Sequence, residues 1–398
     1  MLSTNQIIEK CKKYGANNYS PKEVVFSTAE GCVVTDPEGK QYFDMLSAYS
    51  ALNFGHRHPE IIQAAKDQLD KVTLSSRAFH NEIMGDFLEK LCSLTKKEAV
   101  LPMNTGAEAV ETALKTARRW GNFVKGVEEG KQEIITCNNN FHGRTIGIIS
   151  MSTDPDARAG YGPFLSGFKV IEYGDIEALK NAITPNTVAF MMEPIQGEAG
   201  IIVPPKGFMK EAYELCKENN VLFIADEVQT GFARTGRMFA SELEGVDPDI
   251  YVLGKALGGG VMPISAIAAN KNIMDVFTPG SHGSTFGGNP LACAVSIKAM
   301  EILVRDNYPA MAEEKGNYFM SKLREIENDD IAEIRGKGLL IGVEFKCNAY
   351  KYVKKLIENG VLAKETHEKT IRFAPPIVIT KEQLDSAVEK IKIAFAKQ

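Results

Sequence analysis

Two acidic residues stand directly behind an unbroken apolar run, which is an unusual place for charge. The run VLFIA ends at residue 225, and Asp226 and Glu227 follow it at once. A second apolar run, DIYVLG, leads in the same way into Lys255. A carboxylate can hold a proton on a bound group, and an amine can act as a nucleophile or as a base. Together, Asp226 and Lys255 are candidates for catalysis on a bound small molecule.

A third apolar run, AVLPM, gives way to a helical pattern, NTGAEAVETALKTARRW, whose first turn carries Thr105, Gly106 and Ala107. Small residues in a first turn leave the backbone N–H groups open. A helix start with open N–H groups binds anions, because those groups and the helix dipole both favour negative charge. This segment therefore predicts a phosphate-binding site.

An aspartate, a lysine and a phosphate cradle at one edge of a sheet are the parts that pyridoxal phosphate chemistry requires. The lysine amine bonds to the aldehyde of the cofactor, the aspartate keeps the pyridine nitrogen protonated, and the helix start holds the phosphate. We therefore predict pyridoxal 5'-phosphate as the cofactor, with Lys255 and Asp226 as its main partners.

The elements that must position these residues can be recognised from hydrophobic patterning. Short apolar runs at 133–137, 187–194, 221–227 and 249–254 alternate with amphipathic segments at 176–183 and 207–220. This alternation is typical of βαβ units and a mainly parallel sheet covered on both faces. Ligands of such sheets bind at the carboxyl ends of the strands, where the loops converge. Residues 138–144 and Glu198 follow two of these strands and join the candidates.

The ends of the chain have a different pattern. Residues 24–45 alternate apolar and polar around DPEG, which predicts a small antiparallel hairpin. After about residue 290, long helical patterns lead to GLLIGVEF and IRFAPPIVI, the expected strands of a smaller α+β unit. We predict an N-terminal segment and hairpin (1–50) that joins the small domain, a large α/β domain (51–290) and a C-terminal small domain (291–398).

Composition excludes several classes of protein. The 398 residues carry a net charge of -5, with both signs mixed along the chain, so neither a nucleic acid nor a membrane surface is an expected partner. No apolar stretch approaches about 18 residues, and no signal or transit pattern opens the chain. The seven cysteines are scattered without a CxxC pair. This pattern indicates reduced thiols, and we expect a cytoplasmic protein.

Other motifs lead to weaker interpretations. A lone Asp behind a strand is usually a cap or turn residue, and we expect that structural role for Glu227. The chain contains no GxxxxGK[ST] motif, and GKGLLIG lacks the spacing of a dinucleotide-binding loop. The HRH at 56–58 has no evident third ligand, so we expect a loop before a helix at Pro59 and no metal site.

Long motifs spread over almost the whole chain resemble the class III aminotransferases, which are fold-type I pyridoxal phosphate enzymes. The matching segments include VTLSSRAFHNE, VLPMNTGAEAVETALK, NNFHGRT, EPIQGEAG, FIADEVQTGFARTGR, LGKALGGG and HGSTFGGNP. The resemblance implies an α/β fold with a mainly parallel seven-stranded sheet in the large domain and a smaller α+β domain. It also implies a homodimer, or a higher oligomer, with active sites at the subunit interface.

Roles for individual residues also follow from the resemblance. Lys255 would bond to the cofactor and Asp226 would pair with its ring nitrogen, and both would be catalytic together with Glu198 and Arg372. Phe141 would stack on the ring, Gln229 would face its phenolic oxygen, and Thr105, Gly106, Ala107 and Ser284 would bind the phosphate. Thr285 would reach the phosphate held by the neighbouring subunit. The expected substrate-binding residues are Tyr19, Tyr49, Arg144, Glu198 and Arg372.

The sequence departs from the expected pattern at one position. His142, next to the stacking Phe141, stands where an aromatic residue such as Trp is expected, and it would lie at the edge of the cofactor.

The activity implied by the resemblance is transfer of the δ-amino group of ornithine to 2-oxoglutarate, which gives glutamate 5-semialdehyde and glutamate. That reaction would join arginine and ornithine breakdown to proline metabolism. One alternative is another ω-aminotransferase of the class, acting on N-acetylornithine or 4-aminobutyrate; Tyr19 and the SAYSALN segment argue against it. A second is a cofactor-binding protein without turnover, against which the intact Lys255 and Asp226 argue.

Overall fold

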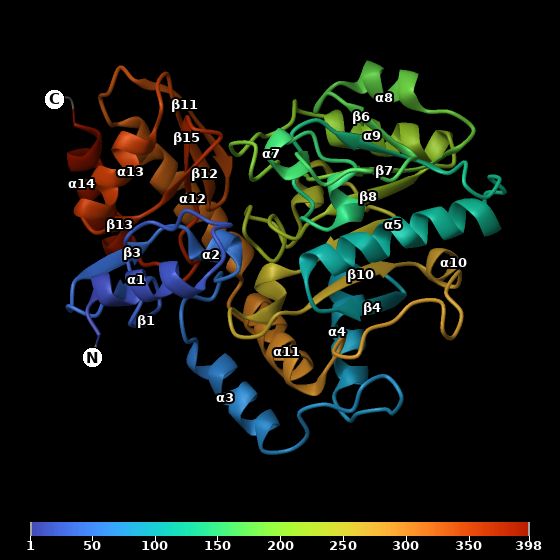
Figure 1. Ribbon diagram of the computed structural model, residues 1–398, viewed down its shortest axis with the longest axis horizontal. Helices are drawn as coiled ribbons and strands as arrows, with labels where there is room; N and C mark the ends of the chain where they lie inside the picture. Colours follow the sequence, from blue (N-terminus) through green and yellow to red (C-terminus); the bar gives the residue numbers. More distant parts are fainter. Residues whose placement is uncertain (1, 397–398) are drawn as a thin grey trace.

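A seven-stranded sheet forms the centre of the larger part of the molecule, as the computed structural model of residues 2–396 shows (Figure 1). The strand order is β4-β10-β9-β8-β7-β5-β6, and β10 alone runs antiparallel to its neighbours. The prediction of a mainly parallel seven-stranded sheet is confirmed. The strands are β4 (Ala99–Met103), β5 (Glu133–Cys137), β6 (Phe168–Ile171), β7 (Thr187–Met192), β8 (Leu222–Asp226), β9 (Ile250–Leu253) and β10 (Ser265–Ala269).

Helices cover both faces of this sheet, which explains why its central strands are buried on both sides. Successive side chains of a strand point to opposite faces. In β8, Ile224 packs into the apolar cluster beneath α5 (Gly106–Phe123), whereas Phe223 and Ala225 pack into the cluster beneath α8 (Ile176–Ala182) and α9 (Phe208–Glu218). Every residue of β7 and β8 is buried.

Shorter elements surround the sheet. They are α3 (Pro59–Leu69), α4 (Met84–Thr95), α6 (Ile146–Ile149), α7 (Pro155–Arg158), α10 (Lys271–Met274) and the 3-10 helices η1 (Ala240–Glu244) and η2 (Lys255–Gly258). His58 directly precedes α3, so the expected loop before a helix at Pro59 is confirmed.

Both ends of the chain build the smaller part, where the blue and red segments lie together in Figure 1. One sheet has the order β1-β2-β3-β13 and the other the order β11-β12-β15-β14. Strand β3 near the N-terminus pairs in parallel with β13 from the C-terminal region. The strands are β1 (Thr28–Glu30), β2 (Val33–Thr35), β3 (Gln41–Asp44), β11 (Ile331–Lys337), β12 (Leu340–Phe345), β13 (Val361–Leu362), β14 (Lys364–Thr366) and β15 (Thr370–Phe373).

The helices of this part begin with α1 (Thr4–Tyr14) and the single turn α2 (Ser47–Ser50). They continue with α12 (Tyr308–Arg324), α13 (Tyr350–Glu358) and α14 (Lys381–Phe395), and α11 (Pro290–Arg305) precedes them in the chain. Although α11 follows the predicted boundary at residue 290, it packs against α3 and α4. One apolar cluster runs from these helices into the small part, and the domain limits 1–50, 51–290 and 291–398 stay a prediction.

Two buried charged residues hold the loop that follows β8. Glu227 accepts hydrogen bonds from the backbone N–H groups of Ala240 (3.0 Å) and Ser241 (2.7 Å) and from two hydroxyl groups. Arg234, with no exposed surface, donates to the carbonyl oxygens of Leu339 (3.0 Å) and Pro375 (2.6 Å) in the small part. The structural role expected for Glu227 is confirmed, and Arg234 joins the two parts.

Candidate active site

A cavity of about 160 Å³ lies at the carboxyl ends of the parallel strands, where the sequence predicted a binding crevice. Strands β4, β5, β7, β8 and β9 each end beside it. Seven of the residues predicted to bind the cofactor line this cavity: Gly106, Ala107, Phe141, His142, Asp226, Gln229 and Lys255. The remaining lining residues are Gly143, Glu193, Ile195, Val228 and Thr230.

Asp226 ends β8 and is almost wholly buried, yet both of its carboxylate oxygens have donors. The Oδ1 atom accepts the backbone N–H of Val228 at 3.1 Å, and Oδ2 lies 2.6 Å from Nδ1 of His142. Burial would lower the pKa of His142, but the hydrogen bond and the charge of Asp226 outweigh it and raise that pKa. The two contacts fix the carboxylate at the wall of the cavity.

Lys255 begins η2 directly behind β9, and its backbone is left-handed, with φ of 45°. Such a conformation is costly for a residue with a side chain and occurs often at functional sites. Burial lowers the pKa of the Lys255 amine, an effect that the negative charge of Glu198 opposes. A lower pKa yields more of the neutral amine, which is the nucleophilic form.

The start of α5 offers unused donors to the same cavity. Thr105 caps the helix and exchanges hydrogen bonds with Glu108 in a capping box. No hydrogen bond within residues 2–396 uses the N–H groups of Gly106 or Ala107, which lie in the first turn of this 18-residue helix. A Cβ atom at position 106 would lie 3.1 Å from Cγ1 of Val228, so the glycine keeps the space open.

A second cavity, of about 480 Å³, reaches Lys255 and Gly106 from the other side and is also lined by Thr105. Thr105 therefore lines the second cavity and not the smaller one. Its capping role in α5 leaves its side chain already engaged.

Next to the cavity, the Arg372 side chain on β15 forms a buried cluster with two polar residues. Arg372 is 1% exposed, and its Nη1 donates to Oε1 of Glu198 at 2.6 Å and to Oε1 of Gln229 at 3.2 Å. Gln229 in turn donates to Glu198 at 3.2 Å. Burial would raise the pKa of Glu198, but the charge and hydrogen bond of Arg372 lower it below its usual value. The carboxylate is therefore ionised at neutral pH.

Tyr49 covers the Arg372 guanidinium, whose carbon lies 4.7 Å from the centre of the ring. Tyr49 is held in a left-handed turn in which four successive residues, 47–50, all have positive φ. The carboxylate of Asp44 steadies this turn by accepting the backbone N–H groups of Leu46 and Ser47. Tyr49, Glu198 and Arg372 therefore lie together beside the cavity.

Four further predicted residues line neither of these two cavities and do not belong to the Arg372 cluster. Tyr19 is 70% exposed on the N-terminal segment. Arg144 is exposed, with its guanidinium carbon 5.6 Å from the centre of the Phe141 ring. Ser284 accepts a hydrogen bond from Asn104 (2.9 Å), just before α5, and Thr285 is exposed. The roles proposed for these four residues stay predictions.

Glu193 was missed by the sequence analysis. It directly follows β7, as Asp226 ends β8, so the same signal could have identified it. Its Oε1 accepts the backbone N–H of Phe141 at 2.9 Å, and its Oε2 accepts that of Gly197 at 3.3 Å. Burial raises the pKa of Glu193 to about 7. Val228, on the wall of the cavity, was also missed.

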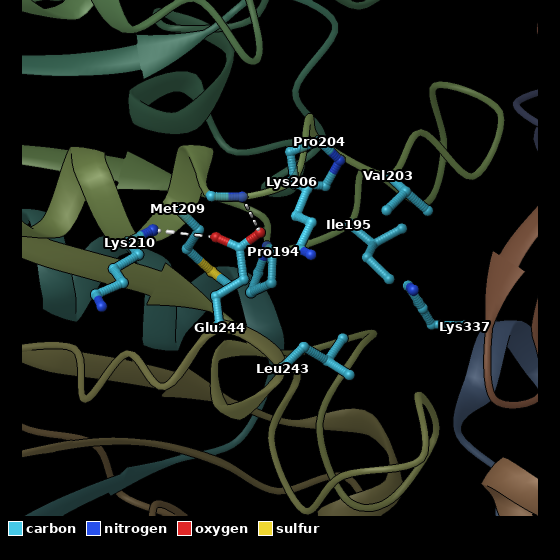
Figure 2. A pocket seen from close by; sticks show the side chains of 11 residues that line it. Pro194, Ile195, Val203, Pro204, Lys206, Met209, Lys210, Leu243, Glu244 and Lys337 are labelled. Atoms are coloured by element: carbon cyan, nitrogen blue, oxygen red, sulfur yellow. Dashed lines mark hydrogen bonds between the residues drawn. The ribbon is translucent and has the colours of Figure 1, made fainter.

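A further cavity of about 420 Å³ lies on the other side of residues 194–195 (Figure 2). Pro194, Ile195, Val203 and Leu243 form much of its wall, and Glu244 accepts backbone N–H groups at the start of α9. None of the predicted catalytic or substrate-binding residues lines it, so it is separate from the candidate site.

The residues of the smaller cavity fit pyridoxal phosphate. The free N–H groups of Gly106 and Ala107 suit a phosphate, and the fixed carboxylate of Asp226 suits a protonated ring nitrogen. Lys255 supplies the amine at the same cavity.

Residues 2–396 contain neither a metal site nor a membrane-spanning helix. Among residues 2–396, no group of His, Cys, Asp and Glu side chains has an arrangement that could hold a metal ion. No helix in that range combines the length and apolar character needed to cross a membrane.

Comparison with known proteins identifies the family of the chain. The model of the family Aminotransferase class-III matches residues 14–395. An ornithine aminotransferase from Geobacillus sp. (strain WCH70) is 62% identical over 396 residues, which cover 100% of both chains.

Two solved structures are also similar along nearly the whole chain. The ornithine aminotransferase of Toxoplasma gondii, with partial occupancy of PLP at its active site, is 44% identical with a TM-score of 0.98, covering 99% of this chain and 94% of that one. The acetylornithine aminotransferase of Elizabethkingia anophelis is 47% identical with a TM-score of 0.90, covering 99% of both. The chain is therefore a member of the class-III aminotransferases, a family of pyridoxal phosphate enzymes.

Proposed function

We propose that this enzyme transfers the δ-amino group of L-ornithine to 2-oxoglutarate, giving glutamate 5-semialdehyde and glutamate. The observation that carries the proposal is the buried Glu198–Arg372 pair beside Lys255, in a chain 62% identical to an ornithine aminotransferase over its full length. Arg372 can bind a carboxylate, and Glu198 can neutralise Arg372 when the reacting end of the substrate has none.

Different residues of the chain have different roles at the cofactor. When bound, pyridoxal phosphate supplies the aldehyde that accepts the amine and an electron-withdrawing ring that stabilises the charge left on the substrate carbon. Lys255 would hold the cofactor through its amine, and the same amine, when free, would remove a proton from the δ-carbon of ornithine. Asp226 would hold the ring nitrogen in its protonated form, and Gly106 and Ala107 would bind the phosphate.

One pocket must accept two differently charged ends. The δ-end of ornithine carries no carboxylate, so an unpaired Arg372 beside it would be a buried, uncompensated charge, and the ion pair with Glu198 removes that cost. Glutamate and 2-oxoglutarate bring an α-carboxylate to the same place. Arg372 then leaves Glu198 and binds that carboxylate, for which a planar guanidinium is well suited.

At the outer end of the pocket, Arg144 would bind the α-carboxylate of ornithine and Tyr19 would lie beside its α-amine. Both residues are exposed in the single chain, where they are free to meet a substrate. This arrangement would direct the α-end of ornithine away from Lys255 and the δ-end towards it.

We further propose a homodimer, or a higher oligomer, in which Thr285 approaches the phosphate held by the neighbouring subunit. The exposure of Thr285 and of its neighbour Phe286, 52% exposed, supports this arrangement. The protein would work in the cytoplasm, since all seven cysteines are free.

N-acetylornithine is the second candidate for the amino donor. The 47% identity to the acetylornithine aminotransferase of E. anophelis favours it, because that value is close to the identity with the T. gondii enzyme. The α-nitrogen is charged in ornithine and uncharged in N-acetylornithine. Comparing the two donors therefore tests what the outer end of the pocket binds.

A substrate comparison tests the proposal. Purified, cofactor-loaded protein is incubated with 2-oxoglutarate and either ornithine, N-acetylornithine or 4-aminobutyrate, and glutamate formation is followed. We expect kcat/KM for ornithine to exceed the other values by at least about tenfold. The Lys255→Ala variant serves as the blank. A preference for N-acetylornithine would replace this proposal by the second candidate.

A further inference from the structure

Glu193, His142 and Asp226 form a buried row of titratable groups at the cavity, brought together from three strand ends. Glu193 follows β7, His142 lies in the loop after β5, and Asp226 ends β8. Glu193 and His142 are 6% and 4% exposed. His142 and Asp226 are joined by the 2.6 Å contact between Nδ1 and Oδ2.

Burial and hydrogen bonding act in opposite directions on the charge of Glu193, and burial raises its pKa to about 7. Each carboxylate oxygen accepts a backbone N–H group, from Phe141 and from Gly197, and hydrogen bonds of this kind stabilise a carboxylate rather than a carboxylic acid. Burial works in the opposite direction and raises the pKa of Glu193. When Glu193 is ionised, its buried negative charge lies near that of Asp226. The two negative charges then require a positive partner.

His142 can supply that positive charge. Its Nδ1 already points at Asp226, and the N–O distance of 2.6 Å is at least as short as that of a charge-assisted hydrogen bond. Its Nε2 is buried without a hydrogen-bond partner among residues 2–396. The negative charges of Asp226 and Glu193 both raise the pKa of His142.

Other titratable groups near the row do not compete for the proton. Burial raises the pKa of the Cys137 thiol and of the Tyr173 hydroxyl, so both stay neutral around neutral pH. Tyr173 donates its hydroxyl hydrogen to the carbonyl oxygen of Glu193 at 2.9 Å and does not approach its carboxylate. Lys255, on the opposite side, is bonded to the cofactor in the resting enzyme according to the proposed function.

We propose that Glu193 is a positioning residue that keeps His142 doubly protonated, so that His142 holds Asp226 ionised and oriented towards the ring nitrogen of the cofactor. The inference deepens the proposed function, since it concerns the same cofactor site. It does not depend on which amino acid donates the amine.

The histidine charge can be measured directly in the absence of substrate. The proton on Nδ1 of a buried histidine bonded to a carboxylate gives a far-downfield NMR signal whose position reports the charge of the ring. The chain has six histidines, and the His142→Gln variant identifies the signal by its loss. The titration is run from about pH 5 to about pH 9 on the apoenzyme and on the cofactor-loaded enzyme.

Two substitutions at Glu193 separate charge from shape. Glu193→Gln keeps the size of the side chain but removes its charge, and we expect the midpoint of the His142 titration to fall by at least about one pH unit. Glu193→Asp keeps the charge but shortens the side chain, and we expect a midpoint near that of the unmodified enzyme. Glu177→Gln, an exposed carboxylate on α8, is the matched control and should change nothing.

Cofactor affinity gives a second readout. Glu193→Gln should weaken the binding of pyridoxal phosphate to the apoenzyme at least about threefold, whereas Glu193→Asp should retain most of the affinity. An unchanged His142 midpoint in Glu193→Gln would overturn the inference. A His142 that is already neutral at pH 7 in the unmodified enzyme would also overturn the inference, because the inference requires a doubly protonated ring; that test remains decisive even if both variants fail to fold. A failed ornithine assay with an unchanged titration would instead reject the proposed substrate alone.

Discussion

The guanidinium of Arg372 lies 2.6 Å from the carboxylate of Glu198, and the arginine has almost no exposed surface. The pair is anchored on both sides, since Gln229 contacts both residues and Tyr49 covers the guanidinium. A buried arginine held in this way is either a fixed structural ion pair or a carboxylate-binding residue whose charge is masked until it is needed. In the proposed function, Arg372 is such a carboxylate-binding residue.

Glu198→Ala distinguishes these two views. With Arg372 always free, the half-reaction with glutamate should be maintained or accelerated, while selectivity for the δ-amine of ornithine over its α-amine falls at least about tenfold. Single-turnover kinetics with each amino acid measure both effects. Glu333→Ala, which removes an exposed partner of Arg335, is the control. Equal losses in both half-reactions with unchanged selectivity would identify a fixed structural pair.

Asp226→Ala should reduce kcat at least about a hundredfold, because a neutral ring nitrogen stabilises the developing negative charge poorly. Asp226→Asn should restore little, since an amide retains the shape but not the charge. The amplitude of a single-turnover reaction with excess enzyme separates slow chemistry from cofactor loss. Activity of Asp226→Asn near that of the unmodified enzyme would show that charge is not what this position supplies.

Mixed dimers test whether each site uses both subunits. Chains carrying Lys255→Ala and chains carrying Thr285→Ala are differently tagged, co-expressed and purified as the heterodimer. If Thr285 serves the neighbouring site, the heterodimer has one intact site and should show about half the activity of the unmodified dimer. A heterodimer with no more than half the activity of the Thr285→Ala homodimer would place Thr285 in the site of its own chain.

Replacing Arg234 should destabilise the folded protein without changing the chemistry of the active site. Its hydrogen bonds to the carbonyl oxygens of Leu339 and Pro375 and to Asn53 are fully buried. Arg234→Leu leaves these acceptors unsatisfied and should lower the free energy of unfolding by about 3 kcal/mol or more. Arg237→Leu removes an exposed ion pair with Glu313 and should cost less than about 1 kcal/mol. Urea unfolding compares the two variants, and equal midpoints would contradict the proposed joining role of Arg234.

The sequence predicted the strands and the edge of the sheet well because both depend on short-range patterns. Buried runs identified β5, β7, β8 and β9 together with the polar residues behind them. The same signal applies to Glu193, which was overlooked in favour of Glu198 five residues later. A turn contains several polar residues, and residue type alone does not determine which of them faces the cavity. The backbone path of the turn decides this.

Two features of the site could not be predicted from the sequence. His142 and Asp226 are 84 positions apart, and only the packing of two separate strand ends brings them into contact. Tyr49 reaches Arg372 from a left-handed turn built of four residues that are not glycine, a conformation that their residue types disfavour. The surrounding fold imposes this turn, so local propensity gives no indication of it.

The central claim is that the δ-nitrogen of ornithine is the one transferred, and isotope labelling tests it most directly. The enzyme is supplied with 2-oxoglutarate and ornithine labelled with ¹⁵N at the δ-position only, and the glutamate produced is analysed by mass spectrometry. The account predicts that nearly all of this glutamate carries ¹⁵N. Glutamate formed at a comparable rate but without the label would show that the α-amine reacts, and it would contradict the proposed roles of Arg144, Glu198 and Arg372 together.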